Sequence, residues 1–170
     1  MRSYIERAQS FVEDIFGYIE ESLEYENFGV NFTSAIERYC EEKHRLVSIE
    51  SGMSRTVLIT SDYVIKIDRN VNSFCGDSED EVRAYQFACD NGFDHLFAEI
   101  TRFKYGGYNF YIMPRVSGIN PYRDDEEMYS YLTEEEADFV DEYFSDLHSG
   151  NFGITKGKII ITDYAWNSIV

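Results

Sequence analysis

Residues 146–151 read Asp-Leu-His-Ser-Gly-Asn, and residues 158–165 read Lys-Ile-Ile-Ile-Thr-Asp-Tyr-Ala. Asn151 follows Asp146 by five positions, and Asp163 ends an apolar run twelve positions later. We expect a loop that holds Asp146 and Asn151, followed by a hairpin that returns Asp163 to the same point. A carboxylate placed to accept a hydroxyl proton, with an amide and a second carboxylate as metal ligands, is typical of phosphoryl transfer.

The composition indicates a globular protein of one domain or two small lobes. The chain has 170 residues, of which 44% are hydrophobic, 16% are aromatic and only 2 are Pro, which excludes a disordered tail. The formal net charge of −17 disfavours direct binding to nucleic acid or to membrane phosphates and favours basic partners. The charge alone also suits an acidic decoy that occupies a nucleic-acid-binding protein, or simply a soluble acidic surface.

The cysteines and the N-terminus indicate the compartment. Cys40, Cys75 and Cys89 are widely spaced and odd in number, which argues for a reducing environment and against a disulfide framework or a zinc site. The first residues contain no apolar signal core, and no apolar run approaches the length of a membrane span. We expect a cytoplasmic protein.

The apolar pattern predicts an α+β chain in which helices come first. Residues 3–24 carry an apolar stripe at helical period, and a second helix is expected to begin at Ser34 with Glu37 completing a capping box. The pattern then changes to strands. We expect three strands at 46–49, 56–60 and 63–67, a helix over 78–91, two strands at 97–103 and 109–116, and a last helix capped by Thr133.

With the elements in this order, the chain resembles the protein-kinase-like fold. The closest likeness is to compact serine/threonine kinases encoded by bacteriophages and to the aminoglycoside-phosphotransferase branch, whose catalytic loop Asp-x-His-x-Gly-Asn matches residues 146–151. The resemblance covers about residues 46–166. It implies a minimal fold in which residues 45–116 form an N-lobe, a five-stranded antiparallel sheet with one helix. Residues 117–170 would form a much reduced helical C-lobe, and the N-terminal helical segment, residues 1–44, would pack on this catalytic half.

The resemblance also implies an ATP site. Lys66 stands where the family keeps the lysine that neutralises the α- and β-phosphates, and Glu81, or Glu79 in its place, would pair with it. The remaining nucleotide contacts would come from a reduced phosphate-covering loop and from the hinge between the lobes. These residues are Gly52 and Ser54 in the loop, Met113 at the back of the adenine pocket, and Val116 as the hinge donor, since Pro114 has no amide hydrogen.

The catalytic loop completes the implied site. Asp146 would accept the proton of a substrate hydroxyl, and Asn151 and Asp163 would coordinate Mg²⁺. His148 would stabilise the transferred phosphate when protonated, or brace the loop by hydrogen bonding.

The chain departs from the family at its C-terminal end. Few residues follow Asp163, so no substrate-binding helical subdomain is evident, and a lobe this small cannot close its own core. We therefore expect the helix of residues 3–24 to pack beneath the catalytic loop and to replace the missing lobe.

The function implied by the resemblance is an ATP- and Mg²⁺-dependent kinase that phosphorylates Ser or Thr of host proteins, and possibly itself. The alternative is a catalytically weak or inactive, kinase-like acidic module that inhibits a host protein by direct binding. Small-molecule phosphotransfer is a third possibility. The sequence indicates neither the target nor the oligomeric state.

Overall fold

The computed structural model describes residues 3–22, 28–43, 47–51, 55–68, 77–116, 128–145, 147–148 and 150–166. The chain divides into two compact units, which we describe separately. Unit 1 comprises Met1–Gly76 and Thr101–Arg115, and unit 2 comprises Asp77–Ile100 and Val116–Val170.

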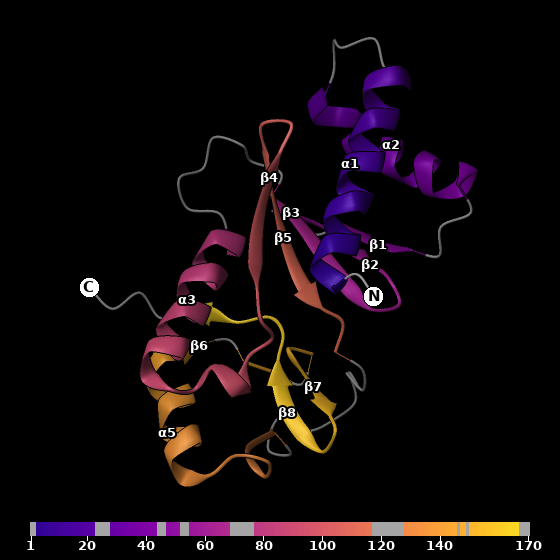
Figure 1. Ribbon diagram of the computed structural model, residues 1–170. Helices are drawn as coiled ribbons and strands as arrows, with labels where there is room; N and C mark the ends of the chain where they lie inside the picture. The colour runs from indigo at the N-terminus through magenta and orange to yellow at the C-terminus, as the bar shows by residue number, and fades with distance from the viewer. Residues whose placement is uncertain are drawn as a thin grey trace. The chain divides into compact units, whose positions relative to one another are not determined.

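Unit 1 contains a five-stranded antiparallel sheet in the order β1-β2-β3-β5-β4 (Figure 1). Its strands are β1 (Ser48–Ser51), β2 (Arg55–Ile59), β3 (Tyr63–Asp68), β4 (Thr101–Tyr105) and β5 (Tyr108–Pro114). Gly106 and Gly107, which join β4 to β5, have φ of +56° and +84°, as a tight two-residue hairpin turn requires. The predicted α+β class and the five-stranded antiparallel sheet are confirmed.

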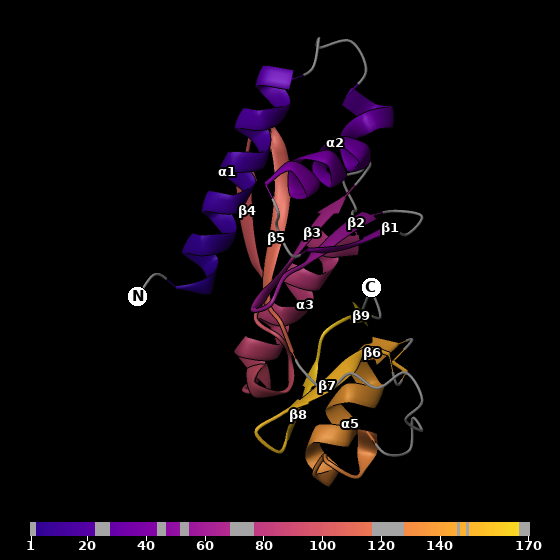
Figure 2. The same ribbon diagram turned by 90° about the vertical axis from the view of Figure 1, so that its right-hand side faces the viewer.

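Two helices of unit 1 bury their apolar faces in one core with the sheet (Figure 2). They are α1 (Tyr4–Ser22) and α2 (Phe28–Glu42). The buried side chains of α1 recur every three or four residues, so that they form one stripe along the helix. The core comprises Ala8, Phe11, Val12, Ile15, Phe16, Ile19, Ile36, Tyr39, Cys40, Leu58, Tyr63, Ile65, Ile67, Phe110 and Ile112.

The apolar stripe of α1 packs on the sheet of unit 1, and the packing of this helix beneath the catalytic loop stays a prediction. One expectation for this region is wrong. The second helix begins at Phe28, six residues before Ser34. The predicted cap Ser34 is therefore an exposed residue inside the helix.

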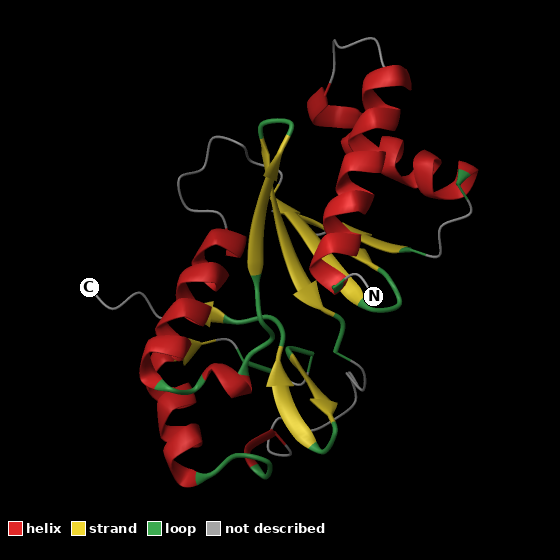
Figure 3. Cartoon of the chain, in the orientation of Figure 1, coloured by secondary structure: helices red, strands yellow, loops and turns green. Residues whose placement is uncertain are grey.

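Unit 2 is built from short elements (Figure 3). Its helices are α3 (Asp77–Asn91), the 3-10 turn η2 (Asp94–Leu96) and α5 (Glu134–Tyr143), and its strands are β6 (Phe144–Ser145), β7 (Phe152–Thr155), β8 (Lys158–Ile161) and β9 (Ala165–Trp166). Strand β6 pairs with β9, and β7 pairs with β8. Helix α3 ends where predicted, with Gly92 at φ +83° and the Phe93 amide donating to the Ala88 carbonyl at 2.9 Å.

The predicted strand from Phe97 starts later, at Thr101. Phe97 instead forms an isolated parallel bridge with Ile161, and its ring packs against those of Phe144 and Tyr164. The strand pattern predicted that Phe97 belongs to the sheet, but its side chain packs in the core of unit 2.

The capping box predicted at Thr133 is present. The Glu136 amide donates to Thr133 Oγ1 at 3.3 Å, and the Thr133 amide donates to Glu136 Oε2 at 2.7 Å. The helix it starts, α5, buries Phe139 and Val140. Within the described part of the chain, no helix combines the length and the apolar content that crossing a membrane requires.

Candidate functional site

The predicted site residues fall into three groups. Lys66 and Met113 lie in unit 1, and Glu81, Val116, His148, Asn151 and Asp163 lie in unit 2. Gly52, Ser54 and Asp146 lie outside the described residues.

Lys66 occupies the face of the sheet opposite α1 and α2. Its neighbours on β3, Ile65 and Ile67, point into the core under the helices, and successive side chains of a strand alternate between faces. Lys66 is only 5% exposed, whereas lysine is almost never fully buried without a polar or charged partner. A lysine this buried, on the face away from the apolar core, calls for a polar or charged partner.

Met113 shares this face with Lys66. In the β3–β5 pairing, Lys66 lies opposite Tyr111, and Val64 lies opposite Met113. Tyr111 and Met113 are two residues apart on β5, so their side chains lie on the same face, and both are buried. The structure thus brings together the two predicted nucleotide-site residues of unit 1.

The hinge segment has restricted hydrogen-bonding capacity. Pro114 has no amide hydrogen, and the Arg115 amide donates to the carbonyl of Asp62 at 3.0 Å. Val116, which is buried, is the next residue with an amide. This geometry favours Val116 as the hinge donor among residues 114–116.

In unit 2, the hairpin β7–β8 brings Asn151 and Asp163 together. The carbonyl oxygen of Asn151 accepts hydrogen bonds from the amides of Thr162 (2.6 Å) and Asp163 (3.3 Å) and from Thr162 Oγ1 (3.1 Å). The β7–β8 register, with Phe152 opposite Ile161, places these residues directly beyond the paired ends of the strands. The hairpin therefore returns Asp163 to Asn151, while its predicted approach to Asp146 lies outside the described residues.

The turn of this hairpin is sharp. Lys156 and Gly157 link Thr155 to Lys158 and have φ of +54° and +75°, as in the tight turns that match the twist of paired strands. A two-residue turn fixes the pairing register of β7 and β8. The turn therefore determines which residues lie next to Asn151.

Tyr164 fixes the chain on the other side of Asp163. It is almost fully buried, its ring packs edge-on against Phe97 at a centroid distance of 5.1 Å, and its hydroxyl donates to the Ala98 carbonyl at 3.2 Å. The Ala98 amide donates in turn to the Ile161 carbonyl at 2.8 Å. The backbone is therefore held at residues 161, 162 and 164, which confines Asp163 between them.

Burial is the main influence on the pKa of the Tyr164 hydroxyl. Loss of solvation, followed by the negative charge of Glu81, raises the pKa of the Tyr164 hydroxyl well above its ordinary value. The phenol stays protonated and remains a hydrogen-bond donor at neutral pH.

Glu81 and Glu79 differ in exposure. Helix α3 begins at Asp77, so Ser78 lies in its first turn. Glu81 is 2% exposed, whereas Glu79 is partly exposed. A buried carboxylate is costly unless it serves a charged or hydrogen-bonding partner, which favours Glu81 as the functional residue of the two.

His148 braces the loop. Its carbonyl accepts from the Asn151 amide at 2.8 Å, and its Nδ1 accepts from the Gly150 amide at 3.1 Å, while the ring is exposed. A Cβ added at Gly150 would lie 2.9 Å from Cε1 of His148, so a larger residue here would displace the exposed ring. Of the two roles predicted for His148, bracing is the one for which the structure contains hydrogen bonds.

The donor atoms at the hairpin fit a hard cation. Asn151 would supply an amide oxygen and Asp163 a carboxylate, the oxygen ligands that Mg²⁺ prefers. Among the described residues, no three His, Cys, Asp or Glu side chains cluster as a metal site would require. A magnesium site here would therefore need ligands other than three such side chains, for example the amide oxygen of Asn151.

Sequence reasoning did not assign a role to Thr162. Its hydroxyl gives the Asn151 carbonyl a third hydrogen bond, and nothing in a strand-ending threonine distinguishes this from an ordinary β-branched residue. Ala98 was missed as well, because its contribution is made entirely by backbone atoms.

No protein-family model matches the chain, and none of the curated proteins does. Among solved structures, the chain is similar to the Legionella pneumophila kinase Lpg2603, which was determined bound to IP6. The two share 16% sequence identity, with a TM-score of 0.46. The match covers 75% of this chain and 53% of that kinase, so the chain spans about half of its length.

Proposed function

We propose that this protein is a protein-kinase-like phosphotransferase that uses ATP and Mg²⁺ to phosphorylate Ser or Thr of a protein. The observation that carries the proposal is the closure of Asn151 onto Thr162 and Asp163 by three hydrogen bonds to one carbonyl. This closure joins the backbones of Asn151 and Asp163, and it supports the proposal that their amide and carboxylate side chains hold one cation.

In the proposed reaction, the oxygen of a substrate hydroxyl attacks the γ-phosphorus of ATP. The bond to the β–γ bridging oxygen breaks, ADP leaves, and the hydroxyl proton passes to the carboxylate of Asp146. Lys66 neutralises charge on the α- and β-phosphates, and its position would be maintained by Glu81. Bound Mg²⁺ would neutralise phosphate charge, and Asn151 and Asp163 are the residues that would hold it.

The charge of the chain favours a basic substrate. The net charge is −17, so the field around the protein attracts cationic proteins and repels nucleic acid. Host nucleic-acid-binding proteins have the corresponding charge. A cytoplasmic location belongs to the same proposal.

The test is transfer of label from γ-labelled ATP with Mg²⁺ to the protein itself and to a basic acceptor such as histone. Wild type is compared with Asp163→Asn and Asp146→Ala, and the matched control is Asp141→Asn, on the exposed side of α5. We expect label with wild type and the control, and a loss of at least about a hundredfold in the two site variants. Equal labelling by Asp163→Asn and wild type would refute the proposed site.

A second candidate is an inactive kinase-like module that inhibits a host protein by binding. It is favoured by the exposed acidic residues along α5, namely Glu134, Glu135, Asp138, Asp141 and Glu142. In the same assay this function predicts no label and no shift of the melting temperature by ATP and Mg²⁺. Capture of a basic host protein would then depend on α5 and not on Asp163.

A further inference from the structure

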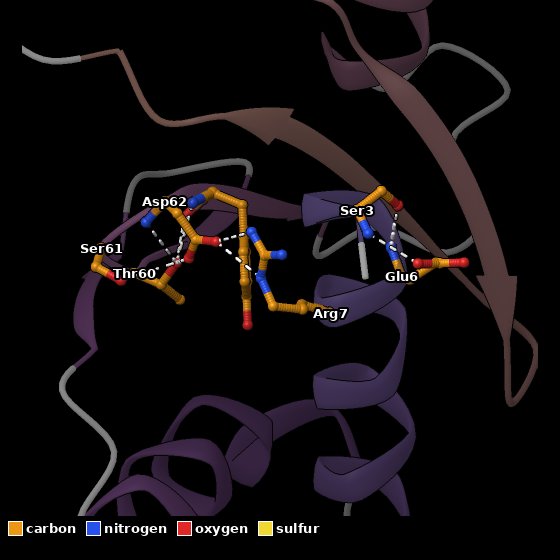
Figure 4. A network of polar contacts seen from close by, with 7 residues as sticks. Ser3, Glu6, Arg7, Thr60, Ser61 and Asp62 are labelled. Carbon is orange, nitrogen blue, oxygen red and sulfur yellow. Dashed lines mark hydrogen bonds and ion pairs between the residues drawn. The ribbon is translucent and has the colours of Figure 1, made fainter. Parts of the chain in front are cut away.

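Helix α1 is tied to the turn between β2 and β3 by a pair of charged residues (Figure 4). Arg7 Nε donates to Asp62 Oδ2 at 2.9 Å, and Arg7 Nη2 contacts the same oxygen. Ser3 and Glu6 form a capping box just before Arg7, with the Ser3 amide donating to Glu6 Oε2 at 2.8 Å and the Glu6 amide donating to Ser3 Oγ at 3.2 Å. The guanidinium therefore extends from a well-defined helix end.

The turn that receives Arg7 is itself closely bonded. Thr60 Oγ1 donates to the Tyr63 carbonyl at 2.8 Å, and the Thr60 amide donates to the same carbonyl at 3.0 Å. The second oxygen of Asp62, Oδ1, lies 3.4 Å from the hydroxyls of Thr60 and Ser61. Asp62 thus connects the helix to every residue of the turn.

The same turn holds Arg115, at the end of β5. The Arg115 amide donates to the Asp62 carbonyl at 3.0 Å, and Arg115 Nη1 donates to the Thr60 carbonyl at 2.7 Å. Arg115 is the last residue of unit 1 before the chain continues at Val116. Residues 7, 62 and 115 therefore form one continuous polar network within unit 1.

We propose that Arg7, acting through Asp62 and the β2–β3 turn, is a positioning residue for the hinge segment that binds the nucleotide. This inference rests on the proposed function, in which Val116 supplies the hinge donor. Arg7 touches no substrate. It holds Asp62 in the orientation in which the Asp62 carbonyl receives the Arg115 amide, and this restrains the Pro114–Arg115 peptide, which directly precedes the peptide that carries the Val116 amide.

A purely structural ion pair makes a different prediction. Arg7 and Asp62 are both partly exposed, and such surface pairs contribute little to folding. A merely stabilising role would lower the melting temperature and leave nucleotide affinity unchanged. A positioning role changes nucleotide affinity at a temperature where all variants are folded.

The experiment measures binding of a non-hydrolysable ATP analogue with Mg²⁺ by calorimetry, using the full chain. The variants are Arg7→Met, Asp62→Asn and the double variant, and all are checked for folding by circular dichroism. The matched control is Arg38→Met on α2, which removes an exposed arginine that is also paired, with Glu42. In parallel, NMR measures hydrogen exchange at the Arg115 amide, a readout that does not depend on nucleotide.

We expect Arg7→Met to weaken binding about fivefold, with no further loss in the double variant, because both changes break one network. Exchange of the Arg115 amide accelerates in Arg7→Met and stays at the wild-type rate in Arg38→Met. If wild type binds the nucleotide and Arg7→Met binds it equally well, the inference fails and the proposed function stands. If wild type does not bind the nucleotide, the proposed function fails, and the positioning role fails with it.

Discussion

The amide of Asp163 donates a hydrogen bond to the carbonyl of Asn151 at 3.3 Å. Eleven residues separate these two positions, and the β7–β8 hairpin closes the loop between them. The two side chains that supply oxygen ligands in the proposed reaction are thus joined through their own backbones.

Replacing Thr162 with Val tests the third bond of this closure. Valine keeps the shape and removes the hydroxyl that donates to Asn151 at 3.1 Å. We expect the free energy of unfolding to fall by about 1 kcal/mol and the apparent affinity for Mg²⁺ to fall with it. Thr162→Ser, which keeps the hydroxyl, is the control, and equal losses in both variants would contradict the role of the bond.

Gly150→Ala tests the brace formed by His148. The new Cβ would lie 2.9 Å from Cε1 of the ring, so the ring must move and lose the bond from the Gly150 amide. Labelling activity should fall about tenfold or more, because small displacements of reacting groups are costly. The loop is exposed, so unfolding measured in urea should change by less than about 1 kcal/mol.

The control for Gly150→Ala is Gly17→Ala, in α1, where an added Cβ meets no atom within 4 Å. It should keep full activity and stabilise the helix by up to about 1 kcal/mol. Loss of activity in both variants would argue against a specific effect at the loop.

The burial of Tyr164 should make the stability of the folded protein depend on pH at alkaline values. Its pKa is raised by burial, so the phenol ionises in the unfolded chain before it does so in the folded one. Its contribution to stability is therefore complete below the ordinary phenol pKa of about 10 and is lost as the pH rises toward the raised value. Tyr164→Phe should be about 1 kcal/mol less stable than wild type at pH 8, since the bond to Ala98 is missing.

This difference should shrink between about pH 9 and pH 11, because only wild type carries the ionisable group. Chemical denaturation of both proteins across this range measures it. A constant difference would mean that Tyr164 is not buried as described.

The hydrogen bonds of Glu136 should make the stability of the folded protein fall at acid pH. The hydrogen bond from His95 (2.7 Å) and then that from the Thr133 amide lower the pKa of its carboxyl. A depressed carboxyl pKa contributes stability above its ordinary value of 4.5 and loses it as the pH falls through the folded-state value. Glu136→Gln should cost about 1 kcal/mol at pH 6 and much less at pH 3.

Thermal unfolding at the two pH values measures the effect of Glu136→Gln. Glu135→Gln is the control, since Glu135 is exposed in the same first turn of α5. A similar pH profile for the two variants would show that the capping box and His95 do not act on Glu136.

Ile19→Ala tests the packing of α1. Ile19 is 1% exposed in the core of unit 1, so its truncation should lower the free energy of unfolding by about 3 kcal/mol. Glu13→Ala, at an exposed position of α1, should change it by less than about 0.5 kcal/mol. An Ile19→Ala protein as stable as wild type would mean that α1 does not pack on the sheet.

Local patterns sufficed for much of this protein. The strand pattern and the Thr133 capping box were readable because each depends on residues close together in the chain. The approach of Asp163 to Asn151 was readable for the same reason, since one short hairpin produces it.

Tertiary structure decided what depends on distant residues. An amphipathic stripe shows that α1 buries one face but not which surface covers it, and the core of unit 1 selected the sheet. The path of Phe97 was likewise set by packing. The network from Arg7 through Asp62 to Arg115 joins positions more than fifty residues apart, and charged residues on a helix or in a turn carry no mark of their partner until folding brings them together.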